Sequence, residues 1–568
     1  MLENMLDYIR IALYTLLVII GFFLFQAWEK DHPMVAPVTQ TQVENAPPAR
    51  YVPEVALNKT EATPTVAAKS ETLANTSPAV PPAVIGKLVT VKTDQLEVTI
   101  DTMGGDIVET KLLSYHESLH SNTPIVLLND NTKTRYIAES GLLSASGPDT
   151  SLKQAVYNTP QTSYVMTPDQ QTLVVPLTWQ KTDGVSVTKT FTFARDSYEI
   201  KVGYQIENQS KQPWEGSLYT QLMRTNAPPP STNGLKNLAT YFGAAISTPE
   251  KKFNKISFKE MQEKGLNQTV QGGWAAMIQH YFITAWVPAG TSTSTYYSKV
   301  TSDGLYTIGM ISKPVVVAPG ARATTESQLY VGPAIADLLE KTSPGLKLTI
   351  DYGWFWFISD IIFWMMQKIY DVVGNWGWSI VLVTVIIKLL FYHLSAKSYR
   401  SMSNLKKLQP RIEALKERYG DDKQKMTQAT LALYREQKVN PMSGCLPILI
   451  QIPVFIALYW VLVESVQLRQ APWIFWIHDL SQHDPYYILP LLMGLSMFLQ
   501  QRLNPAPPDP VQAKIMMLMP IIFTFLFANF PAGLMLYWFV NNTLSFSQQW
   551  FIMHRLVKEN GNGSKAKA

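Results

Sequence analysis

Six apolar stretches with little or no charge constrain this chain more than any other feature of its sequence. The first, Ile11 to Ala27, has 17 residues and no charge. The other five cover approximately residues 376–394, 445–463, 486–500, 515–530 and 534–553. An α-helix needs about 20 apolar residues to cross a bilayer, so these stretches are at the short end of that range. We predict six transmembrane helices, which either lie in locally thin bilayer or extend into flanking polar residues.

The first stretch favours an uncleaved signal anchor over a cleavable signal peptide. It ends in Gln26, Ala27, Trp28, Glu29 and Lys30, without the small-residue pattern of a cleavage site. We therefore predict a signal-anchor helix within residues 1–30. Residues 31–86 follow as a disordered tether, because nine prolines between Pro33 and Pro82 leave too little apolar surface for a core.

Residues 87–344 have the pattern of a large antiparallel β-sandwich. Short runs such as Leu96–Asp101 and Val185–Phe193 alternate polar and apolar residues between turn residues. This domain also explains how a chain with so many apolar stretches has a mean hydropathy of zero. Residues 351–375 combine Trp354, Trp356 and Trp364 with charged residues, which favours a helix at the membrane interface. A buried helix of the sandwich is the alternative.

The charges of the loops predict the orientation. Residues 395–440 contain 11 Lys and Arg against 5 Asp and Glu, whereas residues 464–485 contain only one base, Arg469. By the positive-inside rule the first loop is cytoplasmic and the second is external. The tail, residues 554–568, is basic, and the same rule predicts that it is cytoplasmic. Both termini are then inside, and the tether and the β-domain are outside.

The predicted cytoplasmic loop, residues 395–440, has the pattern of a coiled-coil hairpin. Leu405, Leu408, Ile412, Leu415 and Tyr419 are spaced by three and four residues. Gly420 to Asp422 indicate a turn before a second helix, and Pro410 should kink the first. The basic outer face favours contact with anionic phospholipids. A solvated hairpin without a specific partner fits equally well.

Catalytic motifs give little support for an enzyme. His116 to His120 spell HExxH, which binds zinc when it lies on a helix, but here it lies among predicted strands without a third ligand. We interpret it as a chance surface loop. The chain has no phosphate-binding loop, and its single cysteine, Cys445, excludes a Cys-rich metal site. We predict no catalysis, cofactor or metal, and a net charge of +5 is too weak to indicate nucleic-acid recognition.

Lys388 is the most informative residue, because it is the ionisable side chain deep within a predicted span. Inserting such a charge costs about 2.5 to 3.5 kcal/mol, so it usually faces protein or water. Thr384 lies one helical turn before it, and Gln451 interrupts the next span. On the last span Trp538, Asn541 and Ser545 form a polar stripe at helical spacing. These six residues predict a wet groove within the membrane, with snorkelling of Lys388 and simple interhelical bonding as the alternatives.

Several long stretches of the C-terminal half resemble the YidC membrane protein insertases of the YidC/Oxa type. They are Asn375–Met402, Lys407–Met426, Val439–Leu462, Leu468–Gly494 and Phe530–Asn542, the last reading FPAGLMLYWFVNN. A large β-domain after the first of six spans is similar to the gram-negative bacterial form. The tether and β-domain resemble the family in architecture only.

The resemblance implies a multi-pass protein of the bacterial inner membrane whose β-domain is a periplasmic super-sandwich. It implies an insertase and chaperone for nascent membrane proteins, working alone or with the Sec translocon, with the ribosome meeting the hairpin and the basic tail. The family's groove carries a basic residue, usually arginine, where this chain has Lys388. A family tyrosine aligns with Trp538.

Two other functions remain open from the residues. Lys388 could select small anions in a transporter or channel, although no inverted repeat is detectable. Alternatively, the β-domain could carry the function as a carbohydrate-active or sensing module.

Overall fold

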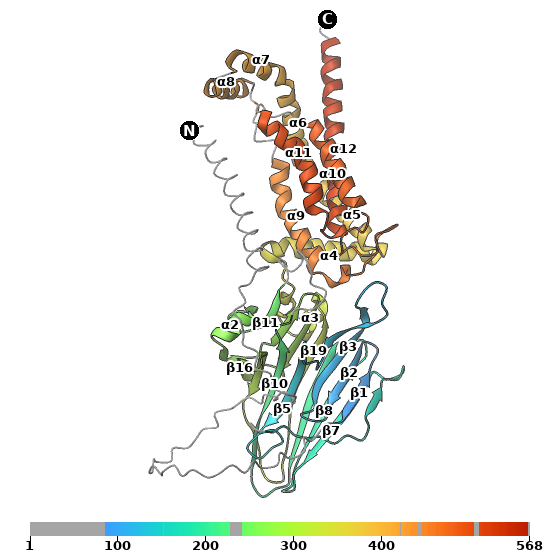
Figure 1. Cartoon of the computed structure of the whole chain (residues 1–568), viewed down its shortest axis with the longest axis vertical. Helices are drawn as coiled ribbons and strands as arrows, with labels where there is room; N and C mark the ends of the chain where they lie inside the picture. The colour runs from blue at the N-terminus through green and yellow to red at the C-terminus, as the bar shows by residue number, and fades with distance from the viewer. Residues whose placement is uncertain are drawn as a thin grey trace, which may run out of the picture. The chain divides into compact units, whose positions relative to one another are not determined.

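The structure is a computed structural model that describes residues 86–150, 153–227, 241–420, 422–437, 439, 446–504 and 510–565. The predicted signal anchor, nearly all of the predicted tether and Cys445 lie outside these residues, as does the end of the basic tail. The described chain has a β-sandwich followed by a helical C-terminal region (Figure 1).

The β-sandwich consists of two sheets. In the larger sheet the strand order is β13-β16-β17-β10-β5-β3-β2-β1-β6, with β18 paired to β10 and β4 paired to β3. Its strands are β1 (Leu88–Lys92), β2 (Leu96–Asp101), β3 (Asp106–His116), β4 (Pro124–Leu128), β5 (Tyr136–Leu143), β6 (Ser163–Val165), β10 (Trp214–Thr225), β13 (Leu266–Gln271), β16 (Thr293–Val300), β17 (Leu305–Ser312) and β18 (Val315–Val317).

The smaller sheet has the order β12-β11-β14-β15-β19-β9-β8-β7. Its strands are β7 (Thr172–Gln180), β8 (Val185–Ala194), β9 (Glu199–Asn208), β11 (Phe242–Ile246), β12 (Asn254–Ile256), β14 (Ala275–Gln279), β15 (Phe282–Pro288) and β19 (Arg322–Pro333). Two short helices, α2 (Phe258–Glu263) and α3 (Ala336–Thr342), and a 3-10 turn, η2 (Leu346–Thr349), accompany the sheets.

Alternation of side chains explains how these strands pack. In β8 every second residue from Val185 to Phe193 is buried, and the residues between them are half-buried. Because successive side chains of a strand point to opposite faces, one face of β8 contributes to the core. The core between the sheets includes the fully buried side chains of Trp214, Trp274 and Trp286.

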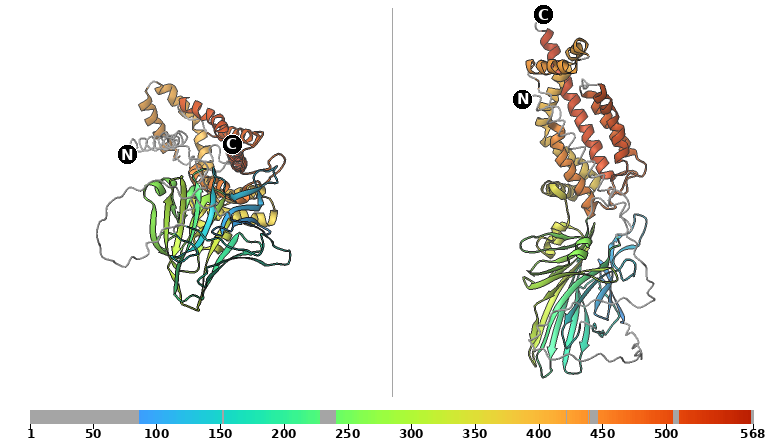
Figure 2. Two further views of the ribbon diagram at one scale, coloured as in Figure 1. Left: turned by 60° about the horizontal axis from the view of Figure 1, so that its bottom comes forward. Right: turned by 60° about the vertical axis from the view of Figure 1, so that its left-hand side comes forward.

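The helical region begins after the turn η3 (Gly353–Phe355) and has a core of its own. Its helices are α4 (Trp356–Val373), α5 (Trp376–Leu390), α6 (Tyr392–Lys407), α7 (Gln409–Tyr419), α8 (Lys423–Glu436), α9 (Leu446–Glu464), α10 (Ile488–Leu503), α11 (Pro510–Phe527) and α12 (Ala532–Lys565), with a turn η5 (Val466–Leu468) between α9 and α10. Figure 2 shows the helices of this bundle side by side, and α12 packs against both α5 and α10.

Two helix boundaries differ from the sequence prediction. The stretch 376–394 is not one straight helix: α5 ends at Leu390, and α6 continues after Phe391 at an angle of 67°. Pro410 does not kink a helix interior but lies in the first turn of α7. Proline is tolerated there because the first N–H groups of a helix have no partner within the helix.

Within the described ranges, no single helix has both the length and the apolar character to cross a membrane by its own composition. The bent pair of α5 and α6 together has the length and apolar character of a membrane span. The apolar helical segments Leu449–Glu464, Ile488–Leu503 and Ala513–Phe527 are shorter than a span requires.

Candidate functional site

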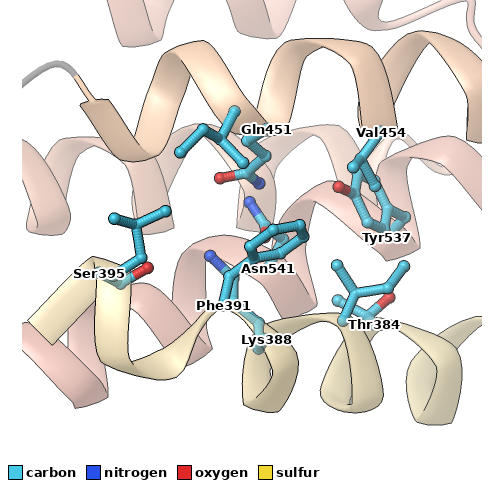
Figure 3. A pocket seen from close by; sticks show the side chains of 11 residues that line it. Thr384, Lys388, Phe391, Ser395, Gln451, Val454, Tyr537 and Asn541 are labelled. Atoms are coloured by element: carbon cyan, nitrogen blue, oxygen red, sulfur yellow. The ribbon is translucent and has the colours of Figure 1, made fainter.

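Lys388 lies near the end of α5, and its ammonium group points into the helix bundle (Figure 3). Lys388 Nζ donates a hydrogen bond of 2.6 Å to Ser545 Oγ of α12. Ser545 Oγ in turn donates to the backbone oxygen of Asn541 at 2.8 Å. In the part of the chain that the structure describes, no carboxylate forms an ion pair with Lys388. Among the described residues, the ammonium group therefore bonds to a hydroxyl group and to no carboxylate.

Three further residues that the sequence singled out surround the same space. Thr384, Gln451 and Asn541 line one pocket together with Lys388. They come from α5, α9 and α12, and Figure 3 shows the Gln451 and Asn541 amides pointing toward the Lys388 amine. The Thr384 hydroxyl donates to the Ile380 backbone oxygen at 2.6 Å, so its proton is already used within α5. The other polar side chains of the lining are Gln451, Asn541, Ser395 and Tyr537.

Trp538 does not line this pocket. Its ring packs against Phe455 and Phe527 at centroid distances of 4.8 Å each, and against Phe523 at 6.1 Å. Tyr537, which is almost fully buried, lines the pocket in its place, together with Phe391. The polar stripe that starts at Trp538 also fits a start at Tyr537, because residues 537, 541 and 545 repeat every four positions.

Most of the other lining residues carry no polar signal that would single them out. Ile387, Phe391, Leu394, Ile450 and Val454 are apolar residues in an apolar part of the chain, and Ser395 completes the set. The cavity volume is about 30 Å³. That volume holds no more than a few water molecules, so the cavity itself does not hold a polypeptide segment.

The HExxH motif has no helical geometry. His116 is the last residue of β3, and residues 117–120 form bends and turns. The backbone oxygens of His116 and Glu117 accept hydrogen bonds from Arg469, at 2.6 and 3.1 Å. Across the described ranges, no group of three or more His, Cys, Asp or Glu side chains is arranged to hold a metal.

The helix α4 presents an apolar face outward. Trp354 in the preceding turn is 92% exposed, and Trp356, Ile361 and Trp364 of α4 are each more than half exposed. The opposite face packs into the bundle through Ile362 and Met366. The helix is therefore not a buried helix of the β-sandwich.

Comparison with known proteins decides the family. Residues 88–365 match the family described as YidC periplasmic domain, and residues 368–559 match the 60Kd inner membrane protein family. The chain is 46% identical over 556 residues to the membrane protein insertase YidC of Stutzerimonas stutzeri (strain A1501), covering 97% of this chain and 99% of that one. It is 48% identical over 558 residues to the one from Legionella pneumophila (strain Corby), covering 98% of each.

The chain belongs to the YidC family. It is accordingly an inner-membrane protein with a periplasmic domain, and its β-sandwich is that domain.

Two solved structures resemble the chain at lower sequence identity. A crystal structure of an active YidC insertase, with its first transmembrane domain resolved, is 19% identical with a TM-score of 0.37, covering 82% of this chain and 94% of that chain. A galactose mutarotase related enzyme from Lactobacillus acidophilus is 11% identical with a TM-score of 0.31, covering 43% of this chain and 97% of that chain. Neither similarity bears on the function at these TM-scores.

Proposed function

We propose that this chain is a membrane protein insertase that passes polar segments of nascent membrane proteins through the pocket around Lys388. Identity of 46 to 48% over nearly the whole length to relatives named membrane protein insertase YidC is the observation that carries this function. The relatives give no support to the alternative of an anion transporter.

The chemistry of the pocket fits the transfer of a polar or acidic segment. The Lys388 ammonium has three donors, and one of them bonds to Ser545 Oγ. An acidic side chain or a peptide carbonyl of the substrate would take the others, while Gln451 and Asn541 replace part of its hydration. The apolar segment that follows then moves into lipid by hydrophobic transfer, without nucleotide hydrolysis. Because the pocket is small, we propose that α9 moves away from α5 and α12 when substrate enters.

The surrounding elements have supporting roles in this proposal. Six spans place both termini and the hairpin α7–α8 in the cytoplasm. The exposed tryptophans near and on α4 suit a helix that lies at the periplasmic membrane surface. The basic hairpin and tail receive the ribosome or anionic phospholipids, and the Sec translocon is a partner for larger substrates.

Substitution of Lys388 tests the proposal. Lys388→Arg keeps the charge and should support insertion, whereas Lys388→Ala should slow insertion of a substrate with an acidic tail roughly tenfold, the effect of losing about 1.4 kcal/mol of charge-assisted hydrogen bonding. The measurement is protease protection of newly made substrate in a strain depleted of its own insertase.

Lys397→Ala is the matched control, since Lys397 is an exposed lysine of α6 outside the pocket. Photocrosslinking from position 451 to a stalled nascent chain, compared with position 538, checks that substrate enters the pocket. Full insertion by Lys388→Ala, or crosslinks from position 538 alone, would contradict the proposed route.

A further inference from the structure

A groove runs between α10 and α11 on the outside of the helix bundle. Its volume is about 560 Å³. It begins beside Tyr487, the residue before α10, and Ala528, the residue after α11, and it ends at Phe498 and Pro520. Since a helix rises by about 1.5 Å per residue, the groove is ~17 Å long. We call it the α10–α11 groove.

Tight contact between the two helices closes the floor of the groove. Pro490, Gly494 and Pro520 are buried, and Thr524 is half-buried. A Cβ added to Gly494 would lie 2.0 Å from Thr524 Oγ1. The Thr524 hydroxyl donates to the Pro520 backbone oxygen at 2.7 Å, so its proton is already used within α11. The floor side chains therefore offer a ligand no free hydrogen-bond donor.

Exposed apolar side chains form the two walls. Leu491 and Leu495 are four residues apart on α10, and Ile521 and Phe525 are four residues apart on α11, so each pair lies on one face of its helix. Leu491 is 62% exposed and Phe525 is 78% exposed. Apart from the floor threonine, the polar side chain of this lining is Tyr487, at one end. The groove is therefore apolar along its length and polar at its mouth.

The membrane around the chain limits what can cover these walls. The family places the chain in the inner membrane. The walls are continuous with Leu499 and Ile522, exposed residues of the same helices outside the groove. The hydrocarbon core of a bilayer is about 30 Å thick, so the groove has the length of one leaflet. A dry cavity of about 150 Å³ holds the six carbons of benzene, and on that scale the groove holds roughly 20 carbons. An acyl chain matches both the length and the volume.

A transmembrane helix of another protein fits the groove less well. Such a helix crosses both leaflets, whereas the groove covers one. Helices in membranes approach each other closely through small residues. Here Thr524 already covers Gly494, and the leucine and phenylalanine walls keep a third helix away from the floor. An acyl chain is thin enough to lie between these walls.

We propose that the α10–α11 groove binds one acyl chain of a phospholipid from the leaflet on the side of Tyr487. Tyr487 then lies at the level of the headgroups, where tyrosine is enriched in membrane proteins. In the orientation proposed above, this leaflet is the periplasmic one. The binding site is separate from the pocket around Lys388 and does not depend on the proposed route of insertion.

The test uses the full-length chain in nanodiscs that contain a small fraction of phosphatidylethanolamine with a diazirine on one acyl chain. After irradiation, mass spectrometry of the peptides gives the labelled residues. Leu491 and Leu495 should carry more label than Leu499, which is exposed but does not line the groove. Because lipid outside the groove is equally apolar, the preference comes from packing contacts alone, and we expect it to be roughly fivefold.

Two matched pairs of variants test whether the groove causes this preference. Phe525→Ala removes part of one wall and should lower the label at Leu491 to that at exposed positions outside the groove. Leu526→Ala is its control, since Leu526 is the next exposed residue of α11 and does not line the groove. Ile521→Trp narrows the groove and should have the same effect, with Ile522→Trp as its control. All four side chains are exposed, so the fold should tolerate these changes.

Two results would overturn the proposal. Equal labelling inside and outside the groove, or a preference that Phe525→Ala and Ile521→Trp leave unchanged, would mean contact with bulk lipid only. The photocrosslinking residue p-benzoylphenylalanine at position 495, compared with position 499 in cells, tests for a protein occupant. Both positions should give equally few crosslinks to other polypeptides, and an excess from position 495 would show a helix in the groove instead of an acyl chain.

Discussion

Lys189 and the half-buried Lys388 differ in the groups that surround their ammonium ions. Lys189 in β8 is fully buried, and its Nζ donates to the backbone oxygens of Ser140 and Gly104 at 2.7 and 3.0 Å. Rings of Tyr157, Phe191 and Tyr204 lie around its ammonium. The β-domain therefore supplies both hydrogen-bond acceptors and aromatic rings for the Lys189 ammonium group. Among the described residues, Lys388 Nζ bonds only to the Ser545 hydroxyl, so donors remain for a substrate group. Lys189 is therefore a structural lysine, whereas Lys388 is suited to binding.

We expect Asp149, near Lys189, to make the stability of the β-domain depend on pH. Its carboxylate accepts hydrogen bonds from the Ala155 and Leu142 N–H groups at 2.8 and 2.9 Å. Burial nevertheless raises the pKa of Asp149 to about 7, against the opposing attraction of Lys189. The pKa of an aspartate in the unfolded chain is near 4. A carboxyl group whose pKa is higher in the folded state contributes its full stabilisation below that pH, and the stabilisation is lost as the pH rises through 7. The β-domain of the wild type should therefore melt at a lower temperature at pH 8 than at pH 5.

Asp149→Asn should flatten this dependence and, by weakening one buried hydrogen bond, lower stability at pH 5 by about 1 to 3 kcal/mol. Circular dichroism of the β-sheet signal during heating, from pH 5 to pH 8, measures both effects. Asp183→Asn is the control, because Lys181 holds the pKa of the exposed Asp183 below its usual value and outside this window. An unchanged slope in Asp149→Asn would assign the pH dependence to another group.

At the scale of elements, the periodicity of apolar residues predicted strands well but did not predict the direction of helix axes. The run Leu96–Asp101 is β2 with the same bounds, and Val185–Phe193 is β8 but for one residue. The bend at Phe391 was not predictable, since hydropathy records which residues are apolar and not the direction of the helix axis. The same limit applies in the pocket. Helical spacing selected Asn541 and Ser545, but three- and four-residue steps left Tyr537 and Trp538 both compatible.

The close packing of α5 against the loop before α10 depends on a glycine. A Cβ added to Gly377 would lie 2.1 Å from the Trp473 ring. Asn375 holds the same loop, as its side chain donates to the Pro472 and Trp473 backbone oxygens at 3.3 Å. Gly377→Ala should therefore destabilise the helical region by about 1 to 3 kcal/mol, the usual cost of overpacking.

A double-mutant cycle identifies the cause of that loss. Trp473→Leu makes room, so the double variant should be more stable than the sum of the single effects predicts. The apparent melting temperature of the detergent-solubilised chain, followed by tryptophan fluorescence, reports each variant. Additive effects would mean that Gly377 is needed for a reason other than contact with Trp473.

At the scale of the whole molecule, the distribution of charge carries the prediction of topology. The excess of 11 bases over 5 acids in residues 395–440 contrasts with the acidic loop 464–485. Because bases near spans stay on the cytoplasmic side, the hairpin and the β-domain should face opposite compartments. Gln424 in α8 and Lys133 in the loop before β5 are exposed positions from which to test this.

Single cysteines at these positions, in a Cys445→Ser background, give the measurement. In cells with an opened outer membrane and an intact inner membrane, a membrane-impermeant maleimide should label Lys133→Cys at once. Gln424→Cys should react only after the inner membrane is broken. The Cys445→Ser parent, the only natural cysteine having been removed, controls for background labelling. Reaction of Gln424→Cys while the inner membrane is still intact would place the hairpin in the periplasm, and it would contradict substrate entry from the cytoplasm, on which the proposed route through Lys388 depends.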